Sequence, residues 1–204
     1  ALQAGWLLGF SDVTSLLFDR VCQGLGGGVH GPMLTTLAAE PAWSQERLRE
    51  LLFGAPVAAL EGIGWHGGCA EGPLLVANLT VATHLLGTPH LPQLKGAILI
   101  LEDVGEPPYR IERMLTQWRL CGALQQLAGL GFGSFEGWNT ADARAGEPAE
   151  RRFDLDQVLR ERSLDLGVPV VAQLPIGHHM GNAALPLGVG ARLDGDRGQL
   201  SLLL

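Results

Sequence analysis

The segment Trp6-Leu7-Leu8-Gly9-Phe10-Ser11-Asp12 contains a short apolar run that stops at a glycine and is followed at once by a serine. The run predicts a buried strand. From Val13 to Val21, apolar residues recur at three- and four-residue spacing, which predicts an amphipathic helix. Ser11 is therefore expected at a strand-to-helix turn, where the free N–H groups of the first helical turn lie close to its side chain.

Two roles fit a serine at such a turn. It can cap the helix with its hydroxyl oxygen, which many serines do. It can also be an activated nucleophile beside an oxyanion site, which requires a base and a carboxylate elsewhere in the chain. The choice between these roles depends on whether the rest of the chain supplies that base and that carboxylate.

Composition limits the kinds of partner. The 204 residues are 47% hydrophobic and 17% charged, with 29 glycines and a net charge of −7, which is typical of a soluble globular protein with many tight turns. Without a basic cluster the chain is not expected to bind nucleic acid or an anionic membrane. Its three cysteines lack C-x-x-C spacing, so reduced thiols in the core of a cytoplasmic protein are expected.

Two downstream strands end in residues that could serve a nucleophile. The clearest buried strand, Gly96 to Asp103, ends in two adjacent acids. Because neighbouring side chains on a strand point to opposite faces, Glu102 and Asp103 are not expected to share a site. A second strand, Pro169 to Leu174, leads to Gly177 and His178. The carboxyl ends of such strands are where α/β proteins bind ligands.

Several weaker motifs have plainer interpretations. Gly24 to Gly28 lacks the Lys-Ser/Thr ending of a phosphate-binding loop and is expected to be a helix end and turn. His30, which precedes Gly-Pro, could line a site, but a hydrogen-bonded structural histidine is the preferred interpretation. The pairs His66 with Cys69 and His178 with His179 offer too few ligands for a metal site, so no metal is predicted.

The remaining pattern suggests further elements and one boundary. The sequence pattern changes at Ala55 to Glu61, where Pro56 interrupts it, and this change predicts a domain boundary. Residues 1–55 are expected in one domain and residues 56–204 in a second. The first strand lies close to residue 1 with no methionine before it, so a longer protein is expected.

Periodicity predicts the remaining elements. Helices are expected at 44–53 (capped by Ser44), from about Asn78, at 109–127 and at 153–166. A strand is expected at 130–135, an exposed loop at 136–152, and closing strands at 185–188 and 192–204 with a turn at Gly195-Asp196.

Ser11, Glu102 and His178 thus each end a short apolar strand, in the order Ser, Glu, His. Four motifs, Gly9 to Thr14, His30-Gly31-Pro32, Leu101 to Leu115 and Gly177 to Gly188, resemble the LD-carboxypeptidase family in the same order. That family includes the microcin C self-immunity peptidases. The resemblance extends from Trp6 to about Leu193. An α/β-hydrolase would need Gly-x-Ser-x-Gly, and position 13 is valine.

The resemblance implies an α/β fold, with the later part of a Rossmann or flavodoxin-like N-terminal domain followed by a mixed α/β, swivelling β/β/α-like C-terminal domain. It implies a cytoplasmic serine peptidase, usually a homodimer, that releases terminal D-alanine from murein tetrapeptides during cell-wall recycling without a cofactor. Ser11 falls on the family's nucleophile, Glu102 on its acid and His178 on its base, and the Asp12 N–H would donate to the oxyanion.

Two departures from the family pattern leave alternatives open. The glycine-rich sequence that precedes the serine in the family has no counterpart here, and Val76-Ala77-Asn78-Leu79 replaces the usual Gly-Gly-Asn-Leu. A second reading is an amidase or immunity peptidase that acts on a peptide-nucleotide or another acylated amine. A third is a non-catalytic remnant of the fold.

Overall fold

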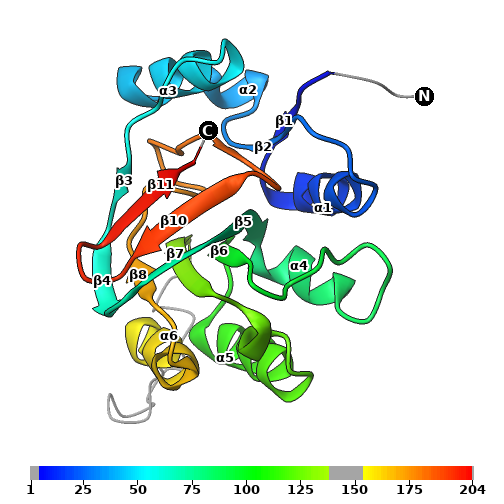
Figure 1. Cartoon of the computed structure of the whole chain (residues 1–204), viewed down its shortest axis with the longest axis vertical. Coiled ribbons are helices and arrows are strands. Elements are labelled where there is room, and N and C mark those ends of the chain that lie inside the picture. The colour runs from blue at the N-terminus through cyan, green and yellow to red at the C-terminus, as the bar shows by residue number, and fades with distance from the viewer. Residues whose placement is uncertain (1–4, 138–153, 204) are drawn as a thin grey trace.

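The computed structural model describes residues 5–137 and 154–203. Its strands form two sheets (Figure 1). The smaller sheet has the order β1-β2-β9, in which β1 and β2 are parallel and β9 is antiparallel to β2. Its strands are β1 (Leu7–Gly9), β2 (Gly28–His30) and β9 (Leu185–Pro186).

The larger sheet has eight strands in the order β3-β11-β10-β5-β6-β7-β8-β4. Its central strands β5, β6, β7 and β8 are parallel, and the flanking pairs are antiparallel. Its strands are β3 (Leu60–Glu61), β4 (Ile63–His66), β5 (Cys69–Asn78), β6 (Ile98–Val104), β7 (Gly129–Glu136), β8 (Val170–Ala172), β10 (Gly190–Asp194) and β11 (Gln199–Leu202).

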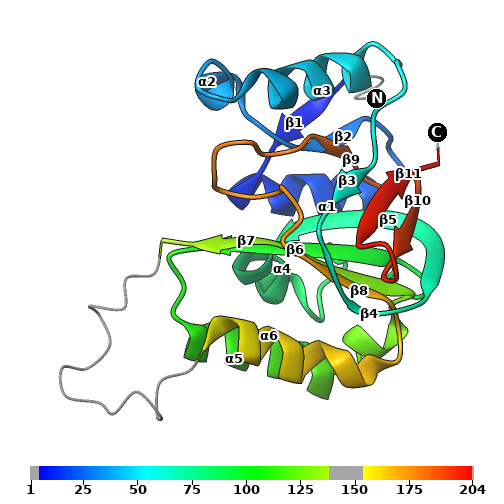
Figure 2. The ribbon, with the colours of Figure 1, turned by 90° about the vertical axis from the view of Figure 1, so that its left-hand side faces the viewer.

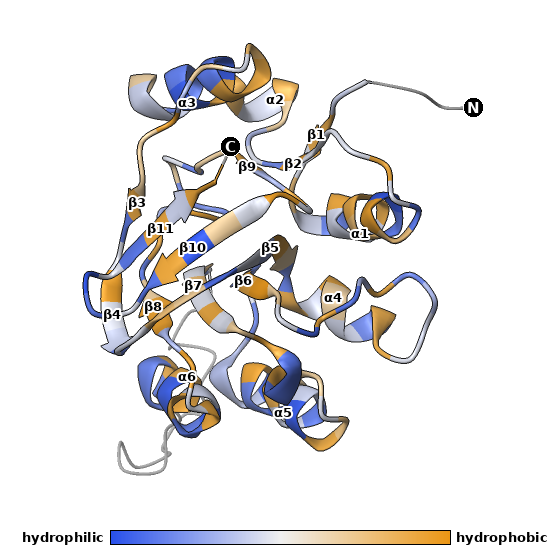
Figure 3. Ribbon diagram, viewed as in Figure 1, coloured by the Kyte–Doolittle hydropathy of each residue, from blue (hydrophilic) through white to orange (hydrophobic). Residues whose placement is uncertain are grey.

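The helices lie in layers around the two sheets. Figure 2 shows α2 and α3 above the small sheet, α1 between the sheets, and α5 and α6 beneath the large sheet. α5 and α6 carry both hydrophilic and hydrophobic residues (Figure 3). The helices are η1 (Ser11–Val13), α1 (Thr14–Cys22), α2 (Leu34–Leu37), α3 (Ala42–Leu52), α4 (Leu79–Leu85), α5 (Pro108–Leu120), η2 (Leu124–Gln126), α6 (Leu155–Ser163) and η5 (Leu164–Leu166).

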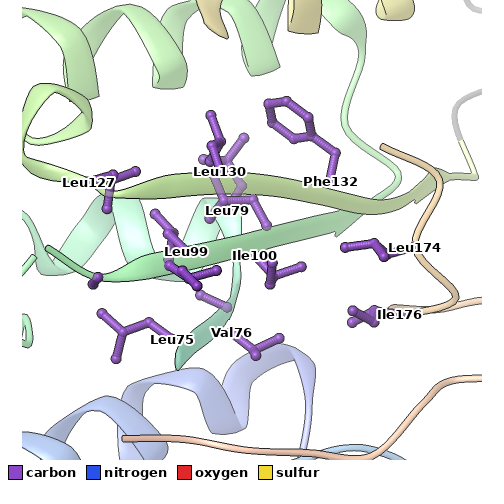
Figure 4. Packing of buried hydrophobic residues seen from close by; sticks show 14 of the residues in the cluster. Leu75, Val76, Leu79, Leu99, Ile100, Leu127, Leu130, Phe132, Leu174 and Ile176 are labelled. Carbon is purple, nitrogen blue, oxygen red and sulfur yellow. The ribbon is translucent and has the colours of Figure 1, made fainter. Parts of the chain in front are cut away.

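The four parallel strands form the centre of the core. The β6 residues from Ile98 to Leu101 are fully buried, and Figure 4 shows Leu99 and Ile100 packed among side chains of β5 and β7. Because α4, α5 and α6 connect successive parallel strands, the carboxyl ends of these strands meet at one edge of the sheet. Glu102 lies at that edge.

The predicted mixed α/β class is confirmed, and so are most of the helices. The predicted helix at 109–127 ends at Leu120 and is followed by η2. The predicted hairpin at the end of the chain is β10 and β11. The predicted loop at 136–152 falls mostly outside the described residues.

Two predictions were wrong in detail, and some elements were not predicted. α3 begins at Ala42 after Pro41, and the Ser44 hydroxyl does not cap it but donates to the Asn182 carbonyl oxygen at 2.7 Å. The three cysteines, Cys22, Cys69 and Cys121, are unpaired as expected, but all are exposed instead of lying in the core. The strands β2, β3, β4 and β5 and the helix α2 were not predicted.

The boundary between residues 55 and 56 stays a prediction. The small sheet contains strands from both predicted domains, because β9 comes from the region predicted to be the second domain and pairs with β2 of the first.

In the part of the chain that the structure describes, no helix combines the length and hydropathy required to cross a bilayer.

Candidate active site

Ser11 lies at the strand-to-helix turn that the sequence predicts. β1 ends at Gly9 and η1 begins at Ser11, whose φ of 59° is in the left-handed region that residues with a β-carbon rarely adopt. The N-caps of η1 and α1 are Phe10 and Val13, and neither end has a side-chain cap hydrogen bond. Ser11 is therefore not a helix cap, and its strained backbone is typical of functional turns.

The turn is closed tightly by Gly9. A β-carbon at this position would lie 2.8–2.9 Å from the side chain of Val13, which is closer than carbon atoms can approach. Glycine is therefore required where the strand meets the first helical turn, and Val13 occupies the space that glycine leaves.

Glu102 and His178 form a hydrogen-bonded pair. The Nδ1 atom of His178 lies 2.7 Å from Oε2 of Glu102, and the side chain of Glu102 is 0% exposed, whereas that of His178 is 17% exposed. Since a carboxylate can only accept, Nδ1 carries the proton and Nε2 is the free nitrogen. The structure thus brings together two of the three residues selected from the sequence.

The carboxyl group of Glu102 stays ionised in spite of its burial. Burial raises its pKa, but the hydrogen bond from His178 and the neighbouring imidazole of His30 outweigh this effect and hold the pKa at about 2. A buried charge is stabilised in this way only when it is paired with donors. The carboxylate of Glu102 therefore stays negatively charged beside Nδ1 of His178.

Phe10 connects the serine turn to this pair. Its ring packs edge-on against the imidazole of His178, with 4.8 Å between the ring centroids. Because Ser11 directly follows Phe10 in the chain, the turn of the small sheet and the histidine of the large sheet lie side by side.

Glu102 and Asp103 serve different parts of the structure, as the strand alternation predicts. Asp103 accepts from the side chain of Asn78 at 3.0 Å, and from the backbone N–H and hydroxyl of Thr80 at 2.9 and 2.8 Å. Asn78 caps α4 by accepting from Val81 N–H. Asp103 therefore fixes the start of α4 and is not part of the Glu102–His178 pair.

A bulge accompanies Glu102 on the neighbouring strand. Leu101 pairs with Phe132 and Asp103 pairs with Phe135, so β7 has one residue more than β6 between these pairs. Bulges of this kind change the direction of side chains and are common beside active sites. The extra length places Gly133 and Ser134 opposite Glu102.

Gly177 allows the histidine loop to approach the acid. Its φ is 123°, and a β-carbon there would collide with the hydroxyl of Ser134 and lie 2.9 Å from Oε2 of Glu102. Its N–H donates to Oδ1 of Asn182 at 3.0 Å. A glycine beside His178 is thus a steric requirement of the acid–base pair.

Sequence reasoning missed the residues that hold the histidine loop. Glu40 accepts from the backbone N–H groups of Gly181 and Asn182 at 2.7 and 3.2 Å. Asn182 itself is buried and bonds both Gly177 and Ser44. Because Glu40 and Ser44 are more than one hundred residues away from this loop in sequence, no local pattern could have identified them.

The preferred interpretation of His30 as a hydrogen-bonded histidine was wrong. This histidine is fully buried as expected of a structural residue, but neither of its ring nitrogens has a hydrogen-bond partner among the described residues. Its Nε2 atom faces Oε1 of Glu102 at 3.9 Å, an ion-pair distance that is too long for a hydrogen bond. His30 therefore belongs to the surroundings of the acid.

Within the described residues, no group of three or more His, Cys, Asp or Glu side chains could hold a metal ion.

A cavity of about 340 Å³ lies next to the histidine loop, at the carboxyl ends of β7 and β8. Ser134, Gln173 and His179 are among the residues that line it.

Comparison with known proteins agrees with these features. The family profile described as the LD-carboxypeptidase C-terminal domain matches residues 71–193. A Synechocystis protein named as a carboxypeptidase is 51% identical over 201 residues, which cover 98% of this chain and 64% of that protein. The murein tetrapeptide carboxypeptidase of Pseudomonas aeruginosa is 36% identical over 207 residues, with 94% of this chain and 63% of that protein covered.

The fold agrees as well. The crystal structure of muramoyltetrapeptide carboxypeptidase from Oxalobacter formigenes superposes with a TM-score of 0.81 at 30% identity, covering 97% of this chain and 67% of that one. The chain spans a little under two thirds of the length of the curated relatives that it matches. These matches show that the chain belongs to the LD-carboxypeptidase family.

Proposed function

We propose that this chain carries the catalytic residues of a serine carboxypeptidase that cleaves the L,D-amide bond of murein tetrapeptides and releases the terminal D-alanine. The observation that carries the proposal is the 2.7 Å hydrogen bond between His178 and Glu102, beside a serine on a strained turn. The named activity of the Pseudomonas relative supports this substrate.

In the proposed mechanism, Nε2 of His178 takes the proton of the Ser11 hydroxyl as the oxygen attacks the carbonyl carbon of the scissile amide. The N–H of Asp12, in the first turn of η1, donates to the developing oxyanion. His178 then passes its proton to the leaving amine, and water hydrolyses the acyl-enzyme by the same steps in reverse.

Glu102 has two tasks in this mechanism. By accepting from Nδ1 it leaves Nε2 as the free base, and its negative charge stabilises the imidazolium that forms during the reaction. A carboxyl group with a pKa of about 2 remains charged throughout the pH range in which a histidine titrates. No cofactor takes part in any step.

The whole-protein properties belong to the same proposal. We propose that the enzyme acts in the cytoplasm as a homodimer and takes part in cell-wall recycling. The family membership and the named murein activity of the Pseudomonas relative support this proposal.

A fluorophosphonate probe tests the nucleophile directly. The chain is expected to be labelled at Ser11, and labelling should vanish in Ser11→Ala and fall strongly in His178→Ala. Ser15→Ala is the matched control, because Ser15 lies on the first turn of α1 and donates only to the Asp12 carbonyl oxygen. Labelling that is unaffected by Ser11→Ala would exclude the proposed nucleophile.

A substrate panel tests the specificity. Release of D-alanine from a murein tetrapeptide, lost in Ser11→Ala, is the expected result. Cleavage of a peptide-nucleotide with no D-alanine release would favour the amidase or immunity-peptidase reading. Absence of both labelling and cleavage would favour a non-catalytic protein.

A further inference from the structure

His30 lies directly beside the serine turn. It is the last residue of β2, and it pairs with Gly9 of β1 and with Leu185 of β9. Its side chain is 0% exposed, and both ring nitrogens lack hydrogen-bond partners among the described residues. Burying an imidazole without partners is unfavourable, and a purely apolar side chain would fill the space without that penalty.

The carboxylate of Glu102, which lies opposite His30, has one oxygen without a hydrogen-bond donor among the described residues. Oε1 of Glu102 is buried and has no hydrogen-bond partner among the described residues, while Oε2 accepts from His178. The distance from Nε2 of His30 to Oε1 is 3.9 Å. A potential donor and an unused acceptor therefore face each other about 1 Å beyond hydrogen-bond distance.

We propose that His30 is a positioning residue that holds the second oxygen of Glu102, so that the carboxylate is fixed between two imidazoles. This inference rests on the proposed function, because it concerns how the acid of that site is oriented. His30 does not touch the substrate, since it has no exposed surface.

The physical effect is on the rotation of the carboxylate. The terminal torsion of a glutamate is broad and roughly two-fold, so one hydrogen bond does not fix the plane of the carboxylate. A second donor at Oε1 restricts that torsion and keeps Oε2 aligned with Nδ1 of His178. The nearby imidazole of His30 also helps to keep the pKa of Glu102 low, which is consistent with this contact.

The surroundings favour His30 for this task. Another buried polar atom near the acid is the hydroxyl of Ser134, which also lacks a partner among the described residues. The hydroxyl of Ser134 and Oε2 of Glu102 are both close to the point that a β-carbon of Gly177 would occupy. The contact that the structure shows at the free oxygen Oε1 is the one with Nε2 of His30 at 3.9 Å.

Two substitutions separate positioning from packing. His30→Gln keeps an N–H donor of similar reach, and His30→Leu fills the space without a donor. We expect His30→Leu to slow labelling of Ser11 by a fluorophosphonate about 10- to 100-fold, as a small misplacement of catalytic groups does. His30→Gln is expected to stay within a few-fold of the unaltered chain, and substrate KM should change little in either variant.

A spectroscopic readout reports on the acid–base pair itself. The Nδ1 proton of His178 should give a low-field proton resonance that is absent in His178→Ala. His30→Leu is expected to shift or broaden it, and His30→Gln to preserve it. Equal behaviour of the two variants, or an unchanged resonance and labelling rate in His30→Leu, would overturn the proposal.

The two readouts separate this inference from the proposed function. If the unaltered chain is not labelled at Ser11, the proposed nucleophile fails, but the resonance still decides whether His30 orients Glu102. If His30→Leu does not fold, His30→Met replaces it, because methionine is flexible, fills irregular space and lacks an N–H donor.

Discussion

Ser11 and the Glu102–His178 pair are held in different ways. Ser11 follows a strand of the small sheet, is half-buried and has a strained backbone with a φ of 59°. Glu102 and His178 lie at the edge of the large sheet, where a short hydrogen bond and a fully buried carboxylate fix them. The nucleophile thus depends on backbone conformation, whereas the acid and base depend on side-chain hydrogen bonds.

This difference has a consequence for how the site tolerates change. Substitutions on the large-sheet side should alter both the rate and the stability, because they disturb buried polar groups. Substitutions that relieve the strain at the serine turn should lower the rate but raise the stability, because the strain opposes folding while it serves the reaction.

The largest expected effect comes from removing the base. His178→Ala should reduce D-alanine release by about 10⁴-fold or more, as loss of the base of a catalytic triad does. His179→Ala is the matched control, since His179 is adjacent but makes no contact with Glu102 among the hydrogen bonds of the described residues. Steady-state kinetics measure both. Equal losses in the two variants would show that His178 is not the base.

A smaller loss is expected when the acid and base are pushed apart. The β-carbon of Gly177→Ala would collide with Ser134 and crowd Glu102, so the rate should fall about 100-fold. Gly188→Ala controls for backbone strain alone, because Gly188 also has positive φ but its nearest neighbour, Val21, is 3.9 Å from the added carbon.

Both alanine variants should lower the free energy of unfolding by about 1–3 kcal/mol through strain. Only Gly177→Ala should lower the rate, which kinetics at matched folded fraction would show. A normal rate in Gly177→Ala would mean that the close approach to Glu102 is not needed for activity.

The buried acid also makes stability depend on pH. The pKa of Glu102 falls from 4.5 to about 2 on folding, so its ionised form stabilises the protein above pH 4.5 and this contribution is lost as the pH falls towards 2. The shift corresponds to about 3 kcal/mol. Urea unfolding at a series of pH values should therefore show a steeper acid loss in the unaltered chain than in Glu102→Gln.

Glu61→Gln removes an exposed carboxylate from β3 and serves as the charge control. Its acid profile should follow that of the unaltered chain. A Glu102→Gln profile that is no flatter than the control would show that the carboxylate is not stabilised by its histidine neighbours.

The features that could be predicted from the sequence are those with a local cause. The serine turn follows from an apolar run, a glycine and a helical stripe that lie next to one another. The separate roles of Glu102 and Asp103 follow from strand alternation. The end of β8 before Gly177 could be recognised in the same way.

The features that could not be predicted depend on pairing between distant segments. His30 faces Glu102 because β2 joins β1 and β9, which its own residues do not specify. β5 has no single period, because its first half alternates in exposure and pairs with β10 while its second half is buried beside β6. The exposure of the cysteines likewise depends on packing and not on composition.

The smallest effect tests the strain at the nucleophile. Ser11→Gly should abolish labelling by a fluorophosphonate and yet raise the free energy of unfolding by about 0.5 kcal/mol, because glycine adopts a positive φ without steric cost. Gln173→Gly is the matched control, since Gln173, with a φ of 56°, is the one other described non-glycine residue in this conformation. It should gain similar stability and keep its labelling. If Ser11→Gly were instead less stable than the unaltered chain, the serine would contribute hydrogen bonds to the fold, and the contrast with the Glu102–His178 pair would not hold.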